Sequence, residues 1–183
     1  MELKALSLSD MELIQHWRNE QLEILRTSFP LTKEMQEQFY HEVISNRQTN
    51  ARFWGIWIQK EYKSSNTIVD ILIGMVGIEN IQWENRLGEI SLILNPEYNN
   101  QENLQQALHL ILEQGFNYLN LDNIFTEVYP TNKLYAEWYE LSKEFSGDIV
   151  ILPNRKYWKG NYYNSRYINF NKERYYEKNN KFI

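Results

Sequence analysis

A helical pattern of apolar residues in the middle of the chain constrains its fold most. Between positions 104 and 119 the apolar side chains recur every three or four residues, on one helical face: Leu104, Ala107, Leu108, Ile111, Leu112, Gly115, Phe116 and Leu119. Strand patterns flank this segment, at 87–94 and at 123–129. A helix that connects two strands packs against their sheet, so the pattern predicts a mixed structure of helices and strands.

The segments before this unit predict one strand followed by helices. Residues 2–7 alternate as a strand, and Ser9 and Glu12 have the spacing of a capping box that opens a first helix. Thr32 is expected to cap a later helix. The buried stripe of that later helix is predicted to consist of Met35, Phe39, Tyr40, Val43 and Ile44.

Three strands in series then predict an antiparallel meander, at 53–58, 68–81 and 87–94. The polar residues 64–66 are expected to connect the first two strands as a hairpin. Gly74 and Gly77 mark points where the long strand bulges or approaches another backbone closely.

The end of the chain predicts one more helix and two strands. The helix begins at Thr131 or Asn132, and the strands cover 149–152 and 162–170, joined by residues 153–161. Residues 177–183 are expected to form a loose end. The whole chain, 1–183, is therefore predicted to be a single α+β domain.

Composition and charge exclude several kinds of site. The chain has no cysteine, which excludes disulfides, thiolate metal sites and a cysteine nucleophile. His16, His41 and His109 lie far apart, so no metal site is expected. No apolar run approaches the ~18 residues of a membrane span, and the N-terminus lacks the pattern of a secretion signal. We expect a cytoplasmic protein with no membrane partner.

The charge is unevenly distributed. Residues 150–183 hold eight basic and two acidic residues, a net charge of +6, which leaves −11 for residues 1–149 because the whole chain carries −5. There are two interpretations of a basic tail rich in tyrosine. It binds a phosphate or a nucleic acid, or it forms a strand pair whose charge partly neutralises the acidic body. We expect the second, and no nucleic-acid partner, because no basic recognition motif is present.

The junction between the strand at 87–94 and the central helix is a candidate anion site. A helix start presents unpaired N–H groups and the positive end of the helix dipole, which suits a phosphate. The other interpretation is that Asn99, Asn100 and Gln101 only cap the helix.

Several short stretches in a fixed order carry a family resemblance. They are Trp17-Arg18-Asn19 with Arg26, residues 73–78, residues 88–98, residues 107–124, and Asn132 followed seven residues later by Tyr139. Over these roughly 140 residues the chain resembles the GNAT acyl-CoA N-acetyltransferases, especially the branch similar to ribosomal-protein N-terminal acetyltransferases. The resemblance implies a mixed, mostly antiparallel central sheet of about seven strands flanked by helices, in which strands four and five splay apart.

The resemblance also implies a binding site for acetyl-CoA as co-substrate. Pantetheine would enter between the splayed strands and pair with the open edge of the fourth strand at Ser91, Leu92, Ile93 and Leu94. The pyrophosphate would rest on the loop and helix start formed by Asn99, Asn100, Gln101, Glu102, Asn103 and Leu104. Asn132 would contact the cofactor near the next helix.

The chemistry of amine acetylation requires a base for the amine and a proton donor for the leaving thiolate. By resemblance, Tyr139 is the candidate donor and Glu127 the candidate base, with Glu89 as the other candidate base; both glutamates are otherwise ordinary strand carboxylates. The implied reaction is direct attack of a primary amine on the thioester within a ternary complex. The acceptor would be a small molecule or a peptide.

The loop at 99–103 departs from the family pattern. The family usually has a basic residue or glutamine and alternating glycines there, whereas this chain has no glycine, no lysine and no arginine. Glycine allows close approach of the backbone to phosphate. The alternative to an enzyme is therefore a catalytically degenerate GNAT-fold binding or scaffold protein that has lost normal CoA binding.

Two further features leave alternatives open. The polar and aromatic loops 83–86 and 154–160 either line the acceptor pocket or pack on the surface. An exposed edge strand near the C-terminus would allow pairing with a second copy, so the chain is expected to be a monomer or a homodimer.

Overall fold

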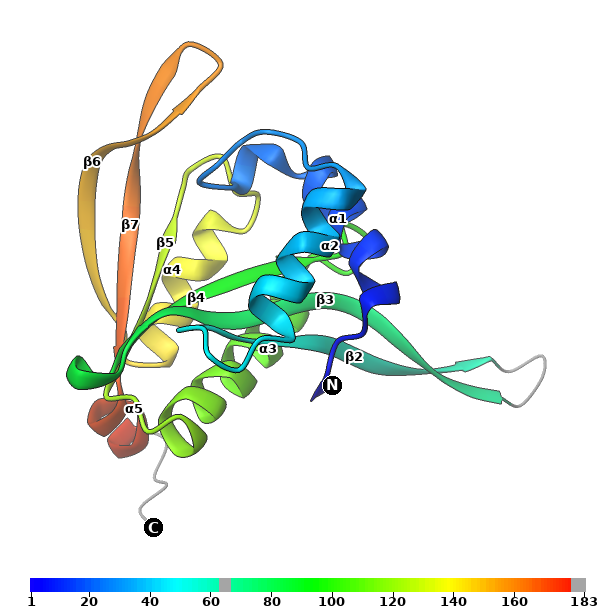
Figure 1. Ribbon diagram of the computed structural model, residues 1–183. Coiled ribbons are helices and arrows are strands. Elements are labelled where there is room, and N and C mark those ends of the chain that lie inside the picture. Colours follow the sequence, from blue (N-terminus) through cyan, green and yellow to red (C-terminus); the bar gives the residue numbers. More distant parts are fainter. Residues whose placement is uncertain (63–66, 179–183) are drawn as a thin grey trace.

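A seven-stranded sheet forms the centre of the protein, as the computed structural model shows (Figure 1). The structure describes residues 1–62 and 67–178. The strands lie in the order β1-β2-β3-β4-β5-β7-β6, and every neighbouring pair is antiparallel except β4 and β5. Their bounds are β1 Glu2–Lys4, β2 Arg52–Tyr62, β3 Thr67–Gln82, β4 Leu87–Leu94, β5 Asn123–Val128, β6 Asp148–Trp158 and β7 Asn161–Asn171. The predicted fold class and the predicted meander of β2, β3 and β4 are confirmed.

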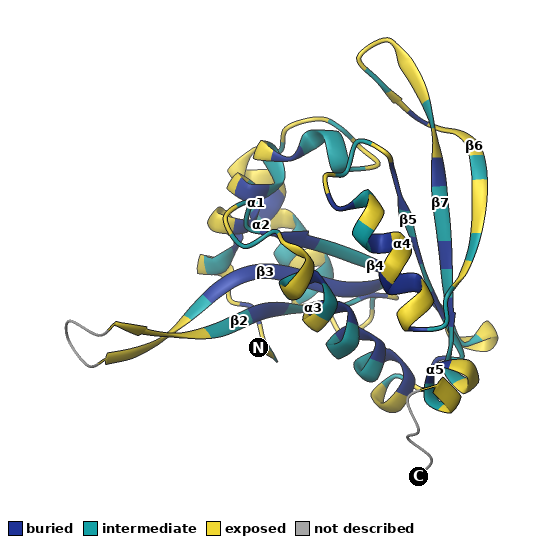
Figure 2. Ribbon diagram, turned by 180° about the vertical axis from the view of Figure 1, so that it is seen from behind, coloured by how far each residue is buried: buried dark blue, intermediate teal, exposed yellow. Residues whose placement is uncertain are grey.

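Helices cover both faces of this sheet (Figures 1 and 2). They are α1 Met11–Glu20, α2 Lys33–Phe39, α3 Gln101–Glu113, α4 Tyr135–Glu144 and α5 Lys172–Lys178. Two helices continue into π-helical turns, α2 over Tyr40–Ile44 and α3 over Gln114–Tyr118. Short 3-10 turns occupy Leu8–Asp10, Leu22–Ile24 and Trp83–Asn85. No helix among the described residues is long and apolar enough to cross a membrane.

Each face of the sheet has its own core. On one face α1 and α2 bury residues such as Ile14 and Trp17 against Met75 of β3 and Ile93 of β4. On the other face α3, α4 and α5 form the larger core around the fully buried Phe116. The strand β4 alternates between the two, because Ile93 belongs to the first core while its neighbours Leu92 and Leu94 contact the second.

The parallel pair β4 and β5 separates after a short contact. Their register joins Leu87 to Asn123, Gly88 to Ile124 and Glu89 to Phe125, and ends there. From Ser91 onward β4 pairs only with β3 on its other side. The predicted splay between strands four and five is therefore confirmed, and it leaves one edge of β4 open.

The two predicted glycines of β3 lie at close approaches. A Cβ atom on Gly74 would stand 2.5 Å from the carbonyl oxygen of Ile93, and one on Gly77 would overlap the ring of Phe53. Any side chain at these positions would push β3 away from a neighbouring strand.

Several predicted boundaries in the first half are wrong. The capping box consists of Ser7 and Asp10, because a 3-10 turn precedes α1. Thr32 does cap α2, and its Oγ1 accepts from the N–H of Met35 at 3.3 Å. The buried position of α2 is Gln36, whereas Met35 is exposed at the rim of a cavity.

The second half also differs from the prediction. The helix predicted from Thr131 or Asn132 begins at Tyr135, after a turn. Strand β6 continues through Pro153 to Trp158 as the edge of the sheet, so most of the predicted connection 153–161 is strand. Residues 172–178 form α5, which corrects the predicted loose end at 177–178. The predicted hairpin residues 64–66 and the end 179–183 lie outside the described residues.

Candidate active site

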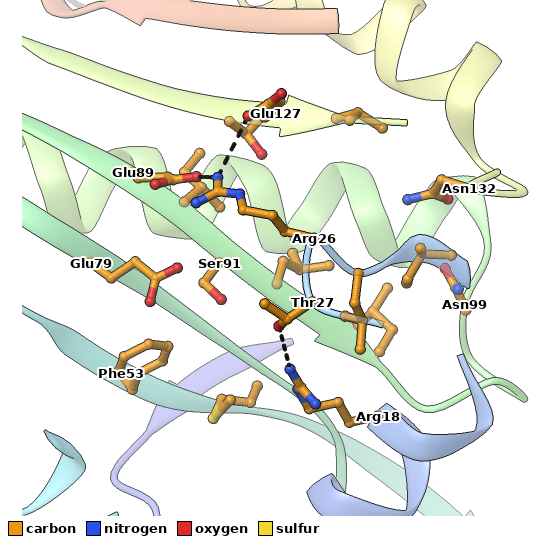
Figure 3. A pocket seen from close by; sticks show the side chains of 18 of the residues that line it. Arg18, Arg26, Thr27, Phe53, Glu79, Glu89, Ser91, Asn99, Glu127 and Asn132 are labelled. Carbon is orange, nitrogen blue, oxygen red and sulfur yellow. Dashed lines mark hydrogen bonds and ion pairs between the residues drawn. The ribbon is translucent and has the colours of Figure 1, made fainter. Parts of the chain in front are cut away.

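A cavity of about 530 Å³ opens where β4 and β5 separate (Figure 3). Its wall includes eight residues that the sequence predicted for the site: Glu89, Ser91, Leu92, Leu94, Asn99, Leu104, Glu127 and Asn132. The other predicted residues stand outside the wall: Ile93, Asn100, Gln101, Glu102, Asn103 and Tyr139. The loops 83–86 and 154–160 do not line it either. The cavity is thus lined by both splayed strands and by the start of α3.

Arg26 lines this cavity and contacts both predicted bases. Figure 3 shows its guanidinium between Glu89 of β4 and Glu127 of β5. It donates a hydrogen bond to Glu89 and lies 3.7 Å from an Oε atom of Glu127. One cation therefore bridges two nearly buried carboxylates across the gap between the strands.

Both carboxylates have further partners. Nδ2 of Asn80 donates to Glu89 at 3.0 Å, and Glu127 accepts from Nε of Arg155 at 2.9 Å and from Oγ of Ser165 at 2.6 Å. Burial alone would raise the pKa of Glu127, but these hydrogen bonds and the charges of the two arginines hold it below its ordinary value. Glu127 is consequently a stable carboxylate with few lone pairs free for a proton.

Glu79 of β3 is a third carboxylate in the cavity wall, and the sequence analysis missed it. Figure 3 shows it directed toward the space beside Ser91. Burial, and then the charge of Glu89, raise the pKa of Glu79 above its ordinary value. The sequence did contain a signal for this residue, because an acid that directly follows the apolar run 71–78 lies at the end of a buried strand segment.

A second missed residue, Arg18 of α1, lines the opposite side of the same space. Its Nη2 donates to Oγ1 of Thr27 at 3.2 Å, as Figure 3 shows. Its Nη1 is buried and has no hydrogen-bond partner among the described residues. Burial lowers the pKa of this guanidinium.

The loop before α3 forms without glycine. Asn100 caps the helix, since its Oδ1 accepts from the N–H of Asn103 at 3.0 Å. No residue from 99 to 104 has a positive φ, so the backbone here does not need the conformational freedom of glycine. Glu102 is exposed and accepts from Nε2 of Gln106 one turn along the helix, at 3.3 Å. Its charge is thus directed along α3 and not into the cavity.

Gln21, which the sequence analysis also missed, holds this loop against the end of β4. Its Nε2 donates to the carbonyl oxygen of Leu94 at 2.7 Å, and its Oε1 accepts from Nδ2 of Asn99 at 2.9 Å. The residue is buried. One amide therefore fixes the open strand and the loop relative to α1.

The loop between β5 and α4 contributes two polar groups near the same opening. Oδ1 of Asn132 accepts from the N–H of Leu134 at 2.9 Å, while its Nδ2 has no hydrogen-bond partner in the described part of the chain. Lys133 is exposed, and its Nζ donates to the carbonyl oxygen of Pro96 at 3.4 Å. A cation therefore spans from this loop to the loop that precedes α3.

Tyr139 lies on α4, away from the cavity wall, and is 38% exposed. Nζ of Lys143 is 3.9 Å from its ring centroid, and the guanidinium carbon of Arg166 is 5.0 Å away. The structure thus surrounds this phenol with cations but does not bring it together with Glu89 and Glu127.

Comparison with known proteins identifies the family. A family model described as "Acetyltransferase (GNAT) domain" matches residues 1–137. The chain belongs to the GNAT acetyltransferase family. A GNAT enzyme is an acyl-CoA N-acyltransferase, and this one uses acetyl-CoA as co-substrate to acetylate a primary amine. The comparisons give no support to the alternative of a degenerate scaffold protein.

Solved structures confirm the GNAT fold. Spermidine N-acetyltransferase from Vibrio cholerae in complex with CoA and spermine superposes with a TM-score of 0.77 at 19% identity, covering 95% of this chain and 96% of that chain. A mutant form of the Vibrio cholerae spermidine N-acetyltransferase gives 0.77 at 20% identity, with 98% of this chain and 99% of that chain covered. A search by sequence among curated proteins gives no match.

Proposed function

We propose that this GNAT enzyme acetylates a small cationic amine by direct attack on acetyl-CoA within a ternary complex. The observation that carries the proposal is the gap between β4 and β5, which opens onto a cavity walled by three carboxylates. Direct transfer is the simplest route because the chain has no cysteine to form an acetyl-enzyme.

The open edge of β4 supports binding of the pantetheine arm. Ser91, Leu92 and Leu94 line the cavity at the part of β4 that does not pair with β5. Unpaired strand groups hydrogen-bond an extended ligand as an added strand would. Ile93, which faces the core of α1 and α2, would contribute through its backbone alone.

The start of α3 supports binding of the pyrophosphate. Backbone N–H groups at 101 and 102 form the first turn of the helix, where no carbonyl four residues back is available within the helix. They lie at the positive end of the helix dipole. Lys133 would supply the positive charge that residues 99–104 lack, and Nδ2 of Asn132 is a further donor.

The acceptor class rests on charge. The cavity wall holds three carboxylates (Glu79, Glu89 and Glu127) against two guanidinium groups (Arg18 and Arg26), and residues 1–149 carry a net charge of −11. A negative field concentrates cationic ligands at a cleft. A polyamine is one acceptor of this kind, and spermine is bound in a solved structure with the same fold. A peptide amine remains the other acceptor to test.

The roles of the predicted catalytic residues stay proposals. Tyr139 would protonate the CoA thiolate as it leaves, from a phenol whose neighbours Lys143 and Arg166 are both cations. Glu89 and Glu127, the predicted bases, are both engaged by Arg26. In this arrangement they would order Arg26 across the gap between the strands.

The experiment measures binding first and turnover second. Calorimetry is expected to show acetyl-CoA binding, and a thiol-release assay is expected to show turnover with spermidine, spermine, an amino-sugar nucleotide or a peptide with a free N-terminus. Tyr139→Phe should keep the binding and lose turnover, while the exposed Tyr118→Phe on the far end of α3 should keep both. No binding at millimolar acetyl-CoA, or binding without turnover of any of these amines, would overturn the proposal.

A further inference from the structure

Glu79 differs from the other two carboxylates of the cavity in its partners. Glu89 and Glu127 are each held by an arginine and at least one neutral donor. The side-chain carboxylate of Glu79 accepts no hydrogen bond and forms no ion pair within 4 Å among the described residues. A partly buried carboxylate without a partner is costly, so its place in the wall of an active site calls for a ligand.

The sheet directs Glu79 into the cavity. It stands directly opposite Glu89 in the β3–β4 register, so the two side chains share one face of the sheet. The register then shifts between Glu79 and Gln82, and Asn80 between them has a positive φ of 53°. Irregularities of this kind re-aim side chains beside active sites. Here the Asn80 amide turns to Glu89, and Glu79 is left free.

The charged groups that face Glu79 come from three elements. Glu89 of β4 repels its charge, while Arg18 of α1 and Arg26 of the segment before α2 attract it without pairing to it. Arg26 is already held by Glu89 and Glu127, and Arg18 by Thr27. The space between Arg18 and Glu79 therefore suits an amine that approaches the carboxylate.

We infer that Glu79 is the carboxylate that receives the acceptor amine and takes its proton. The inference deepens the proposed function and rests on it. Glu127 is the poorer base of the two, because its donors lower its pKa, whereas burial and Glu89 raise the pKa of Glu79. A base is most effective when its pKa lies near the operating pH.

Each proton and electron pair has a defined destination in this step. The bound ammonium gives one proton to Glu79, and the freed nitrogen lone pair forms the N–C bond to the thioester carbonyl. The C–S bond breaks, and its electron pair leaves on the CoA sulfur, which takes the phenolic proton of the proposed donor Tyr139. The second amine proton then restores that phenol. The products are the acetamide and CoA thiol, and Glu79 releases its proton to water.

The test compares Glu79→Gln with Glu84→Gln, which alters an exposed glutamate outside the cavity. With the best amine of the panel, Glu79→Gln is expected to lower kcat/KM at neutral pH by about 100-fold or more. It should also remove the acidic limb of the kcat/KM pH profile. The dissociation constant of acetyl-CoA should change less than twofold, and Glu84→Gln should match the wild type in every respect.

Two measurements judge Glu79 without any acceptor. The first is an NMR titration of protein labelled at the glutamate carboxyl carbon. The Glu79 resonance is assigned as the one that is missing in Glu79→Gln, and in the wild type it should titrate above the ordinary pKa of glutamate. The variant should also melt at a higher temperature than the wild type at neutral pH, and this gain should shrink in acid. The reason is that a raised folded-state pKa makes the ionised form costly, and the cost appears as the pH rises through the range above 4.5.

The outcomes separate the two proposals. If the wild type acetylates none of the amines tested, the proposed function is overturned. The titration and melting results would then still test the inference about Glu79. A normal or lowered titration of Glu79, or a Glu79→Gln variant that keeps kcat/KM within fivefold with its acidic limb intact, would overturn the inference even where the wild type acetylates an amine.

Discussion

Replacement of Arg26 by methionine tests the electrostatic centre of the site. Arg26→Met keeps the unbranched apolar stem of the side chain and removes the charge that Glu89 and Glu127 share. The side chains of these glutamates are 7% and 4% exposed, so both would lose a counter-ion in a poorly solvated place. The variant is expected to be less stable, and to lose that stability mainly where the carboxylates are charged.

The expected loss in the free energy of unfolding lies between two limits. Breaking a fully buried ion pair costs about 3–5 kcal/mol, and an exposed pair contributes about 0.2–1 kcal/mol. The Arg26 side chain is 50% exposed, and both glutamates keep other donors, so the loss should be smaller than that for a fully buried pair. We expect a loss of about 1–3 kcal/mol. At about 2–4 °C per kcal/mol for a chain of this size, the melting temperature falls by roughly 2–12 °C.

Thermal unfolding followed by circular dichroism at pH 7.5 and near pH 4 measures this loss. As the pH falls through the lowered folded-state pKa of Glu127, this carboxylate takes up a proton and no longer needs a counter-ion, so the difference in melting temperature between variant and wild type should narrow. Arg174→Met is the matched control, because the Arg174–Asp148 pair is exposed on both sides and should contribute under about 1 kcal/mol. Equal melting of Arg26→Met and wild type at pH 7.5, or a deficit that persists unchanged in acid, would refute the reasoning.

Three further predictions concern the loop, the sheet and the acid range. Lys133→Gln should raise the dissociation constant of acetyl-CoA about two- to fivefold by calorimetry, with Lys33→Gln on the exposed face of α2 unchanged; equal affinities would remove Lys133 from the site. Gly77→Ala should cost about 1–3 kcal/mol in denaturant unfolding, because its Cβ meets both Phe53 and the Arg52 carbonyl oxygen, and an unchanged midpoint would contradict that contact. The lowered folded-state pKa of Glu127 contributes stability that is present above pH 4.5 and is lost as the pH falls through the folded-state value. Glu127→Gln should therefore flatten the acid side of the stability profile, and a profile as steep as that of the wild type would speak against the Arg155 and Ser165 bonds.

The fold followed from the sequence where local patterns and burial agree. The central helix and β4 were predictable because their apolar residues face cores that extend along the whole element. Boundaries failed where tertiary contacts override local signals. Pro153 suggests a break, yet β6 continues through it because an edge strand tolerates proline. Residues 172–178 are highly charged, yet α5 forms because Tyr175 is fully buried against Phe116.

The site was predictable in position and less so in chemistry. The strand-to-helix junction follows from the order of the elements, and the splay was implied by the family resemblance. Together they identified the cavity wall. The state of each carboxylate depends on partners that are distant in sequence. Arg26 is 63 residues from Glu89, and Arg155 is 28 residues from Glu127. No local pattern distinguishes these paired glutamates from Glu79, which follows an apolar run and remains without a partner among the residues that the structure describes.

The loop before α3 shows why a missing glycine is ambiguous in sequence. Glycine serves such a loop either through a positive φ or through the absence of a Cβ atom. Because no residue from 99 to 104 has a positive φ, the first need does not arise here. Whether a Cβ atom interferes depends on where the side chains point. Asn99 bonds to Gln21, Asn100 accepts from the N–H of Asn103, and Glu102 accepts from Gln106. The N–H groups at 101 and 102 are thereby left uncovered, and affinity for acetyl-CoA should depend on these three side chains keeping their partners.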